Sequence, residues 1–369
     1  MKFPSRDKST VAVAQIIPEI ATVPPPLGAE GRLRDSFGRA ITDLRVAVTD
    51  RCNYRCVYCR TGDFVGGYSE LQLADYAHMV QVLVGLGVEK IRLTGGEPLL
   101  RTDLPELIRS IRSMRRAFDD KGLPTGDGGP LDIALTTNGH SLAPIAKDLK
   151  QAGLDRITVS MDAVDEATFA RVTRVPRAFG RVLDGIHAAQ DAGLAPVKVN
   201  CVLLRGWNDD QVEAFGEFAR RENVVLRFIE FMPLEEDRTW SRDAVVTEAE
   251  ILERLGAVWP LIPLSPNSAS ETARRYGFAD GRGEIGIIAP VSRPFCGHCS
   301  RLRLTSDGKL RTCLFSQVDH DLHEKIQDGV AGAELEAYIR SVVRGKEERH
   351  HIGESGFAKP SRSMVQIGG

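Results

Sequence analysis

The sequence predicts an α/β fold: an incomplete TIM-like barrel of six βα units, followed by a smaller C-terminal α+β domain. The first observation is that short β-branched runs alternate with helical patterns six times between residues 44 and 231. The second is that no G-x-G-x-x-G follows the first strand, which ranks an open doubly wound sheet below a barrel. The third is that this alternation ends after Trp240.

Each βα unit is predicted from its own local pattern. In the first unit, Ser69 is a candidate N-cap, apolar residues follow at helical spacing, and Gly87 ends the helix. Strands are expected at 44–48, 90–94, 132–136, 156–160, 197–203 and 225–231. The helices that connect them are expected at 69–86, 103–117, 142–151, within 165–192 and at 209–220.

Three regions follow from this pattern: a flexible N-terminal extension (1–38), the barrel (39–240) and a C-terminal domain (241–369). The extension contains a run of prolines, which prevents helix and offers little to bury. A Gly- and Pro-rich insert at 121–130 interrupts the barrel. The C-terminal domain should contain helices near 248–256 and 334–348, a β-rich stretch at 283–289, and a Gly-Gly tail.

Composition narrows the possible partners and location. The chain has 369 residues, 42% hydrophobic and 27% charged, and no apolar run approaches the length of a membrane span. A formal net charge of −2 argues against binding to nucleic acid or to a membrane surface. Because no secretory segment is visible and the seven cysteines are clustered, we expect a cytoplasmic protein whose thiols serve metal chemistry.

The most informative stretch is a cysteine triplet directly after the first predicted strand. Cys52, Cys56 and Cys59 have C-x-x-x-C-x-x-C spacing. Three soft ligands can hold one metal ion or one cluster, whereas a structural zinc site uses four ligands. The absent fourth ligand indicates an open coordination position. Three buried thiols, or half of a zinc site, are the alternatives.

A second triplet lies in the C-terminal domain. Cys296 and Cys299 are followed by Cys313, and His298 would complete a Cys3His zinc site in the alternative interpretation. Arg301 and Arg303 lie between these thiols and share one face of an extended segment, where paired guanidinium groups can bind phosphate or carboxylate. Cys201, alone in an apolar strand, is most simply a core residue.

Polar residues also gather where the predicted strands end, which is where parallel barrels bind ligands. After the second strand, Gly95 and Gly96 allow backbone groups to approach a ligand closely, and Glu97 is a candidate partner for an amine. The later strands carry or end in Thr136, Asn138, Ser160, Asp162, Lys198, Asn200, Arg227, Glu230 and Met232.

Taken together, these motifs resemble the radical S-adenosylmethionine (radical SAM) enzymes. The first triplet followed by Gly95-Gly96-Glu97-Pro98 carries that resemblance. The string 43–53, the late segment 296–304 with Cys313, and the terminal Ile367-Gly368-Gly369 are similar to the GTP 3',8-cyclase family, also called the molybdenum cofactor biosynthesis protein A family. The resemblance covers roughly residues 36–369.

The resemblance implies a set of site residues and cofactors. Two [4Fe-4S] clusters would be held by the two triplets, Cys52, Cys56 and Cys59, and Cys296, Cys299 and Cys313. S-adenosylmethionine would contact Tyr58, Gly96, Ser160 and Met232. GTP would contact Arg45, Arg92, Thr136, Lys198, Arg301, Leu302 and Arg303, and Arg45, Arg301 and Arg303 would be catalytic.

The implied reaction is the first step of molybdenum cofactor (molybdopterin) biosynthesis. A radical derived from S-adenosylmethionine abstracts the ribose 3' hydrogen of GTP, and attack on guanine C8 followed by one electron and one proton gives (8S)-3',8-cyclo-7,8-dihydroguanosine 5'-triphosphate. The implied partners are an electron donor, a downstream pterin-forming enzyme and a second copy in a homodimer. The Gly-Gly tail resembles a family tail that inserts toward the active site.

One departure and two alternatives accompany the resemblance. Family members usually follow the first triplet with Met-Pro, whereas here Arg60-Thr61 follows Cys59. Another radical SAM enzyme with an auxiliary cluster, such as a peptide maturase, is the second interpretation, although such enzymes tend to carry more C-terminal cysteines. A non-catalytic zinc or iron–sulfur protein is the third.

Overall fold

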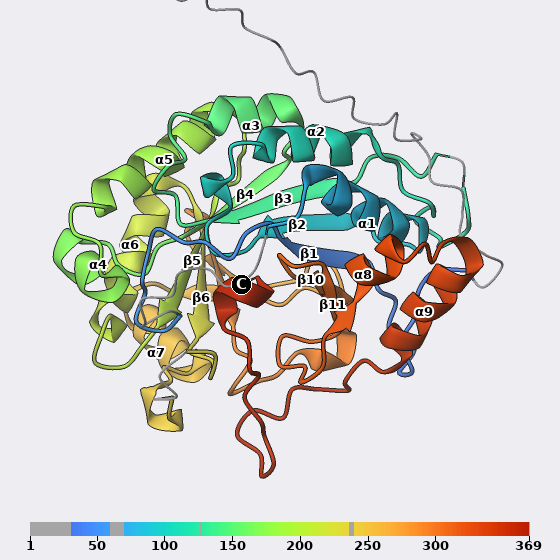
Figure 1. Cartoon of the computed structure of the whole chain (residues 1–369). Helices are drawn as coiled ribbons and strands as arrows, with labels where there is room; N and C mark the ends of the chain where they lie inside the picture. The colour runs from blue at the N-terminus through green and yellow to red at the C-terminus, as the bar shows by residue number, and fades with distance from the viewer. Residues whose placement is uncertain (1–30, 60–69, 126, 236–239, 369) are drawn as a thin grey trace, which may run out of the picture.

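Helices surround one face of a curved, mostly parallel sheet in the computed structural model of the chain (Figure 1). The structure describes residues 31–59, 70–125, 127–235 and 240–368. Within these ranges twelve strands form one sheet, in the order β12-β11-β10-β1-β2-β3-β4-β5-β6-β9-β8-β7. The two outermost described strands do not pair with each other, so the barrel is open, and the predicted incomplete TIM-like barrel is confirmed.

The six predicted strands form the centre of the sheet and pair in sequence order, all parallel. Residues alternate in burial along them, for example buried Leu44 and Val46 around partly exposed Arg45, because successive side chains point to opposite faces. The strands are β1 (Asp43–Ala47), β2 (Lys90–Thr94), β3 (Asp132–Thr137), β4 (Arg156–Ser160), β5 (Lys198–Leu203) and β6 (Val225–Glu230).

The helices that follow these strands pack on the outer face, as Figure 1 shows. They are α1 (Leu73–Gly85), α2 (Leu104–Ser113), α3 (Ala146–Ala152), α4 (Glu166–Thr173), α5 (Phe179–Asp191) and α6 (Val212–Glu222).

Three predicted bounds of the barrel helices are wrong by four residues. The third helix begins at Ala146 rather than at 142, because residues 141–145 form turns. Gln72 is the N-cap of α1, with a reciprocal capping box to Asp75, whereas Ser69 lies outside the described residues. The second helix ends at Ser113 rather than 117, because Met114 adopts an extended conformation. Arg115 then pairs with Pro130 across the insert, which uses the backbone groups that a longer helix would have occupied.

The C-terminal region extends the same sheet at both edges, a feature that the sequence did not predict. β9 (Glu284–Ile288) pairs in parallel with β6, and β10 (Arg301–Leu304) pairs in parallel with β1. Antiparallel strands continue outward from each. They are β7 (Leu261–Leu264) and β8 (Arg274–Phe278) beside β9, and β11 (Lys309–Arg311) and β12 (His320–Asp321) beside β10.

The remaining helices lie in this C-terminal part: α7 (Glu248–Val258), α8 (Leu322–Gln327), α9 (Gly332–Arg344) and α10 (Met364–Ile367). The helix expected near 334–348 is α9, which ends at Arg344, four residues earlier than predicted. Residues 31–38 of the predicted extension pack onto the barrel: Leu33 is fully buried and pairs with Leu86 and Ile41 through backbone hydrogen bonds. No described helix has the length and apolar character needed to cross a membrane.

Candidate active site inside the open barrel

The inner face of the sheet carries a group of cations. The pairing register sets Arg45 between Arg303 on β10 and Arg92 on β2, because all three occupy inward-facing positions of parallel neighbours. Lys198 and Arg227 occupy inward positions on β5 and β6. The structure thus brings together side chains from five strands that are far apart in the sequence.

Burial, and then the crowding of these cations, lowers their pKa values. Burial lowers the pKa of Arg45 well below its usual value, and the charges of Arg303 and Arg92 lower it further. Burial, with neighbouring arginines, also lowers the pKa of Arg227 to about 9 and of Lys198 to about 8. Asp43 and Asp132 near Arg92, and Glu271 near Lys198 and Arg227, oppose only part of this shift. The remaining excess of positive charge favours an anionic ligand, which would relieve the repulsion.

Hydroxyl and amide groups orient two of these arginines. The Arg92 guanidinium donates to Thr136 Oγ1 at 3.1 Å and to Thr158 Oγ1 at 3.3 Å. Arg227 donates to Asn200 Oδ1 at 2.9 Å and to Thr158 Oγ1 at 3.1 Å. Thr158 therefore links the two arginines. The sequence indicated Arg227 only as one polar residue of the sixth strand, and it received no role there.

Leu302 stands apart from the other predicted GTP residues. Its side chain is fully buried in the hydrophobic core on the outer face of β10, because it alternates with Arg301 and Arg303. A ligand inside the barrel can therefore reach Leu302 only through its backbone.

The first cysteine triplet lies beyond the end of β1. The backbone N–H of Cys59 donates to the Cys56 carbonyl oxygen at 3.0 Å, which closes a turn. Burial raises the pKa of the Cys56 thiol well above its usual value, and the negative charges of Asp162, Cys59 and Cys52 raise it further. The three thiols therefore lie close enough for their charges to interact, and none of the described cysteines forms a disulfide. Crowded thiolates of this kind are suited to binding cationic iron.

Gly95 and Gly96 are needed by the protein's own backbone. The N–H of Gly96 donates to the Thr49 carbonyl oxygen at 2.8 Å. A Cβ on Gly95 would lie 2.2 Å from the Thr49 oxygen, and one on Gly96 would lie 2.2 Å from the Arg51 oxygen. The glycines thus let the cysteine loop lie directly against the end of β2, a reason that the sequence did not reveal.

Glu97 is buried, and internal donors bind its carboxylate. It accepts hydrogen bonds from the backbone N–H of Leu99 and Asn138, at 3.0 and 2.6 Å, and from Thr137 Oγ1 at 2.7 Å. Burial raises its pKa to about 7, although these hydrogen bonds oppose the shift. In the structure, Glu97 therefore connects the ends of β2 and β3. The sequence had indicated it as a candidate partner for an amine.

The four residues predicted to contact S-adenosylmethionine all lie at the carboxyl ends of strands, in the loops after β1, β2 and β6 and at the end of β4. They are Tyr58, Gly96, Ser160 and Met232. The Tyr58 hydroxyl donates to Asp162 Oδ2 at 2.7 Å, and the Val202 N–H donates to Asp162 Oδ1 at 2.8 Å. Asp162 thereby fixes the Tyr58 ring beside the first triplet, a role that the sequence did not assign.

The second triplet lies at the opposite end of β1 from the first. Cys296 and Cys299 precede β10, whose first residue Arg301 pairs with Asp43 at the start of β1, and Cys313 follows β11. Burial alone would raise the pKa of the Cys299 thiol, but the charges of Arg301 and Lys346 outweigh burial and lower it to about 6. His298, the fourth ligand of the alternative zinc interpretation, is exposed.

The three thiols of this second site also lie close enough for their charges to interact. The negative charge of Cys299 raises the pKa of both Cys296 and Cys313, after the larger effect of burial. Arg301 donates to Cys299 Sγ at 3.5 Å. Three soft donors beside cations fit an iron–sulfur cluster, whose net charge is negative once thiolates bind it. Among the described residues, no three His, Cys, Asp or Glu side chains gather as ligands of a single metal ion.

Lys346 connects the two segments that carry the second triplet. Its ammonium donates to the carbonyl oxygen of Arg301 at 3.0 Å and to that of Thr312, and the side chain is buried. Thr312 Oγ1 in turn donates to Glu347 Oε2 at 2.7 Å. Nothing in the sequence marked Lys346, which falls in the stretch expected to form a charged helix near 334–348.

The C-terminal tail reaches the inner face of the barrel, where Figure 1 marks the end of the chain. Arg303 donates to the carbonyl oxygens of Ile367, at 3.4 Å, and Gly368. A Cβ on Gly368 would lie 2.7 Å from a Thr94 side-chain carbon, so glycine fits where another residue would not. Upstream, a paired hydrogen bond from Arg362 to Asp307, at 3.0 and 2.9 Å, anchors the tail.

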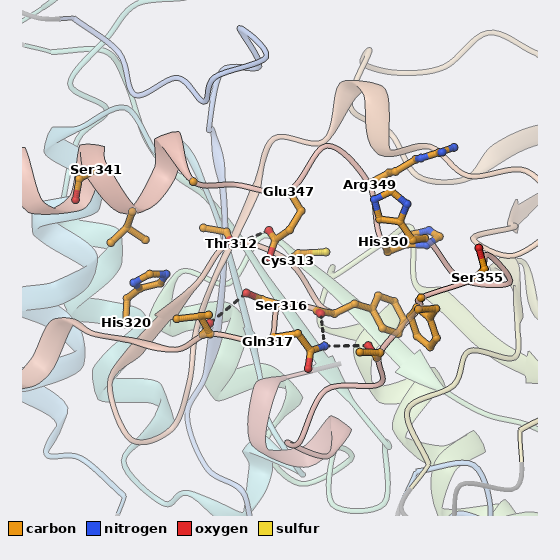
Figure 2. A pocket seen from close by; sticks show the side chains of 18 of the residues that line it. Thr312, Cys313, Ser316, Gln317, His320, Ser341, Glu347, Arg349, His350 and Ser355 are labelled. Carbon is orange, nitrogen blue, oxygen red and sulfur yellow. Dashed lines mark hydrogen bonds between the residues drawn. The ribbon is translucent and has the colours of Figure 1, made fainter.

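A cavity of about 590 Å³ lies outside the barrel, against the second triplet (Figure 2). Of the predicted site residues, only Cys313 lines it. Figure 2 shows Glu347 joined to Thr312 on one side of Cys313 and His350 on the other.

Comparisons with known proteins show which families share this architecture. A family model described as "Radical SAM superfamily" matches residues 46–219, and one described as "Molybdenum Cofactor Synthesis C" matches residues 224–352. The barrel and its first cysteine loop therefore define a radical SAM protein. Streptococcus suis SuiB bound to S-adenosylmethionine shares the fold, with a TM-score of 0.56 at 12% identity over 82% of this chain and 68% of that one.

Much more similar relatives share nearly the whole chain. A GTP 3',8-cyclase from Xanthomonas axonopodis pv. citri is 44% identical over 91% of this chain and 99% of that relative. Those of Moorella thermoacetica and Acidothermus cellulolyticus are 40% and 41% identical, over 91% and 84% of this chain and 100% and 84% of theirs. The chain belongs to the GTP 3',8-cyclase family.

Proposed function

We propose that this chain converts GTP into (8S)-3',8-cyclo-7,8-dihydroguanosine 5'-triphosphate, with S-adenosylmethionine as the radical source, in the first step of molybdenum cofactor biosynthesis. One observation carries the proposal: a row of crowded cations runs along the inner face between two cysteine triplets at opposite ends of β1. The named activity of relatives that match nearly end to end supports it.

The two triplets are proposed to hold two [4Fe-4S] clusters. Cys52, Cys56 and Cys59 would hold the first, and Cys296, Cys299 and Cys313 the second. The chemistry that the bound groups supply is one-electron cleavage of S-adenosylmethionine at the first site and one-electron exchange with the substrate at the second. Tyr58, whose hydroxyl donates to Asp162, and the backbone of Gly96 would contact S-adenosylmethionine.

The cations of the inner face are proposed to bind GTP. One group of cations is suited to the triphosphate. It consists of Arg92 and Arg227, which both donate to Thr158, and of Lys198 on β5. Arg301 and Arg303 lie on the strand that follows Cys299, so they would hold the end of the nucleotide nearest the second triplet. Thr136, which accepts from Arg92, completes this set.

Arg45 is the strongest candidate for proton transfer. Its pKa is lowered well below the usual value by burial and by Arg303 and Arg92, so releasing a proton relieves repulsion. Bound triphosphate would raise the pKa of Arg45 part of the way back toward its usual value. Arg301 and Arg303 are the other candidates, and the pKa of Arg303 is lowered to about 10 by burial. An electron donor and a pterin-forming enzyme that takes up the product are the implied partners.

The direct test is anaerobic incubation of the reconstituted protein with GTP, S-adenosylmethionine and dithionite. We expect about eight irons per chain, GTP-dependent formation of 5'-deoxyadenosine, and one cyclised nucleotide for each 5'-deoxyadenosine formed. Replacing Cys296, Cys299 and Cys313 by Ala should leave about four irons. If 5'-deoxyadenosine forms equally without GTP, and no cyclised nucleotide appears, the proposal is wrong.

A further inference from the structure

A carboxylate lies at the phosphate end of the proposed nucleotide site. It belongs to Glu271, a half-buried residue in the connection between β7 and β8. Burial lowers the pKa of both Lys198 and Arg227, and the negative charge of Glu271 opposes the shift at both of them. The sequence indicated no role for Glu271, and the proposed chemistry does not use it.

The register of the sheet brings this connection to the inner face. Arg275 on β8 pairs with Gly286 on β9, and Gly286 pairs with Arg227 on β6, so all three positions face inward. A Cβ on Gly286 would lie 3.0 Å from Arg227 Cγ and 3.1 Å from Ala273 Cβ. The glycine thus leaves room for the segment that carries Glu271 to lie beside the stem of Arg227.

Arg275 holds the same segment in place. Its guanidinium donates to the Ser265 carbonyl oxygen and to Asn267 Oδ1, both at 2.9 Å, and to the Glu284 carboxylate at 2.8 and 2.7 Å. Asn267 in turn donates to the Glu271 carboxylate, through its backbone N–H at 2.6 Å and its side-chain amide at 3.2 Å. Neutral donors therefore orient this carboxylate and leave its negative charge in place.

Two other acids near this end of the site are paired with arginines. Asp132 Oδ1 accepts from Arg156 at 2.9 Å, and Glu284 pairs with Arg275. Each of these pairs adds no net charge. Within the part of the chain that the structure describes, Glu271 has no cation at ion-pair distance, so its charge acts through space on the cations of the phosphate site.

We propose that Glu271 is the counter-charge of the nucleotide site, which weakens the binding of triphosphate by the cations so that substrate and product can exchange. This inference rests on the proposed function and adds a residue to the same site. The proposed product keeps all three phosphates of GTP, so contacts with the phosphates bind substrate and product alike. Such contacts do not speed the chemical step, and phosphate binding that is too tight would retain the product.

The experiment compares variants of the reconstituted holoenzyme under anaerobic conditions. Glu271→Gln removes the charge and keeps the size of the side chain. Glu217→Gln is the matched control, because Glu217 is exposed on the outer helix α6 and its replacement makes the same change in net charge. The probes are GTP, inorganic triphosphate and guanosine. Their binding is measured by calorimetry at about pH 6.5, where Lys198, with its pKa of about 8, is charged.

We expect Glu271→Gln to bind GTP and inorganic triphosphate about 3- to 10-fold more tightly than the wild type, because a repulsion between carboxylate and phosphate is removed. Guanosine, which has no phosphate, should bind within about twofold of the wild type, and so should each probe to Glu217→Gln. In turnover assays, the KM for GTP should fall by a similar factor while kcat does not rise. Structural damage would weaken binding, so it cannot produce a gain in affinity.

Equal or weaker binding of GTP by a folded Glu271→Gln protein overturns the counter-charge proposal and leaves the cyclase proposal intact. A wild-type protein that makes no cyclised nucleotide refutes the cyclase proposal, while the binding of inorganic triphosphate still decides on Glu271. Glu271→Ala also removes the charge and should show the same gain, so it serves if the Gln variant fails to fold. Glu271→Asp keeps the charge and should stay closer to the wild type. A gain with Asp as large as with Gln would overturn the proposal.

The pH dependence of binding gives an independent measurement. Lys198 faces Arg227, Arg156 and Arg92 as well as Glu271. Without the charge of Glu271, the Lys198 ammonium should lose its proton at a lower pH, so GTP affinity should begin to fall at a lower pH in Glu271→Gln than in the wild type. A fall that begins at the same pH in both proteins would show that Glu271 does not act on Lys198, and the proposal would be wrong.

Discussion

Lys346→Met tests whether one buried ammonium holds the second cysteine site together. In the native protein Lys346 Nζ donates to the carbonyl oxygens of Arg301 and Thr312 from a side chain that is 4% exposed. Methionine keeps the length but removes the donor and the charge. Each buried carbonyl that loses its donor costs about 1–3 kcal/mol. Because the ammonium no longer has to be desolvated, part of this cost is recovered, and we expect a net loss of about 2–4 kcal/mol.

The assay combines urea unfolding with iron analysis. In a background where Cys52, Cys56 and Cys59 are Ala, only the second site remains, and it should retain about four irons with Lys346 and at most about half as many with Met. Lys346→Arg is the matched control, since it keeps a charged donor and should retain more iron than Met. A Lys346→Met protein with about four irons and an unchanged urea midpoint would refute this reasoning.

Three further predictions concern the barrel. Gly96→Ala places a Cβ 2.2 Å from the Arg51 carbonyl oxygen, so the first site should lose most of its iron and 5'-deoxyadenosine formation should fall about 100-fold or more; a normal iron content would contradict this. Arg227→Gln removes a cation from the proposed triphosphate site and should weaken GTP binding about 10- to 100-fold by calorimetry, with both clusters intact. Lys198 has a pKa of about 8 without ligand, and bound triphosphate would raise it. GTP affinity should therefore fall as the pH rises above about 8, and Lys198→Arg should remove this step.

The barrel strands were predictable because their pattern is local. Alternating apolar and polar residues placed all six within one or two residues of the observed bounds, as at 90–94 and 156–160. The joining of β9 and β10 to this sheet depends on pairing between distant segments, for which a single sequence carries no periodic signal. The predicted start of the first helix was wrong because its capping signal was ambiguous. Gln72 is a weaker capping residue than the serine three residues earlier.

In the site, sequence motifs indicated functional residues better than side-chain type alone did. The cysteine spacing and the Arg301–Arg303 pair stood out by position, and the structure brings them to the barrel, although their ligands remain predictions. Arg227 had no motif, and its place beside Asn200 depends on the register of β5 and β6. Lys346 resembled any surface lysine, because only tertiary packing buries it between two loops. The glycine pair stood out by its motif, and in the structure it contacts the neighbouring loop.

The parallel pairing of β1 with β10 also sets an order in which the protein can fold. Ser300 hydrogen-bonds to Asp43 across 257 residues, so this edge of β1 has no described partner strand until nearly all of the polypeptide has left the ribosome. Until then β1 presents open hydrogen-bonding groups next to the first cysteine loop, an arrangement that invites pairing with other chains. A nascent chain therefore has to be protected longest at this strand, and slow synthesis or early release should lead to aggregation there.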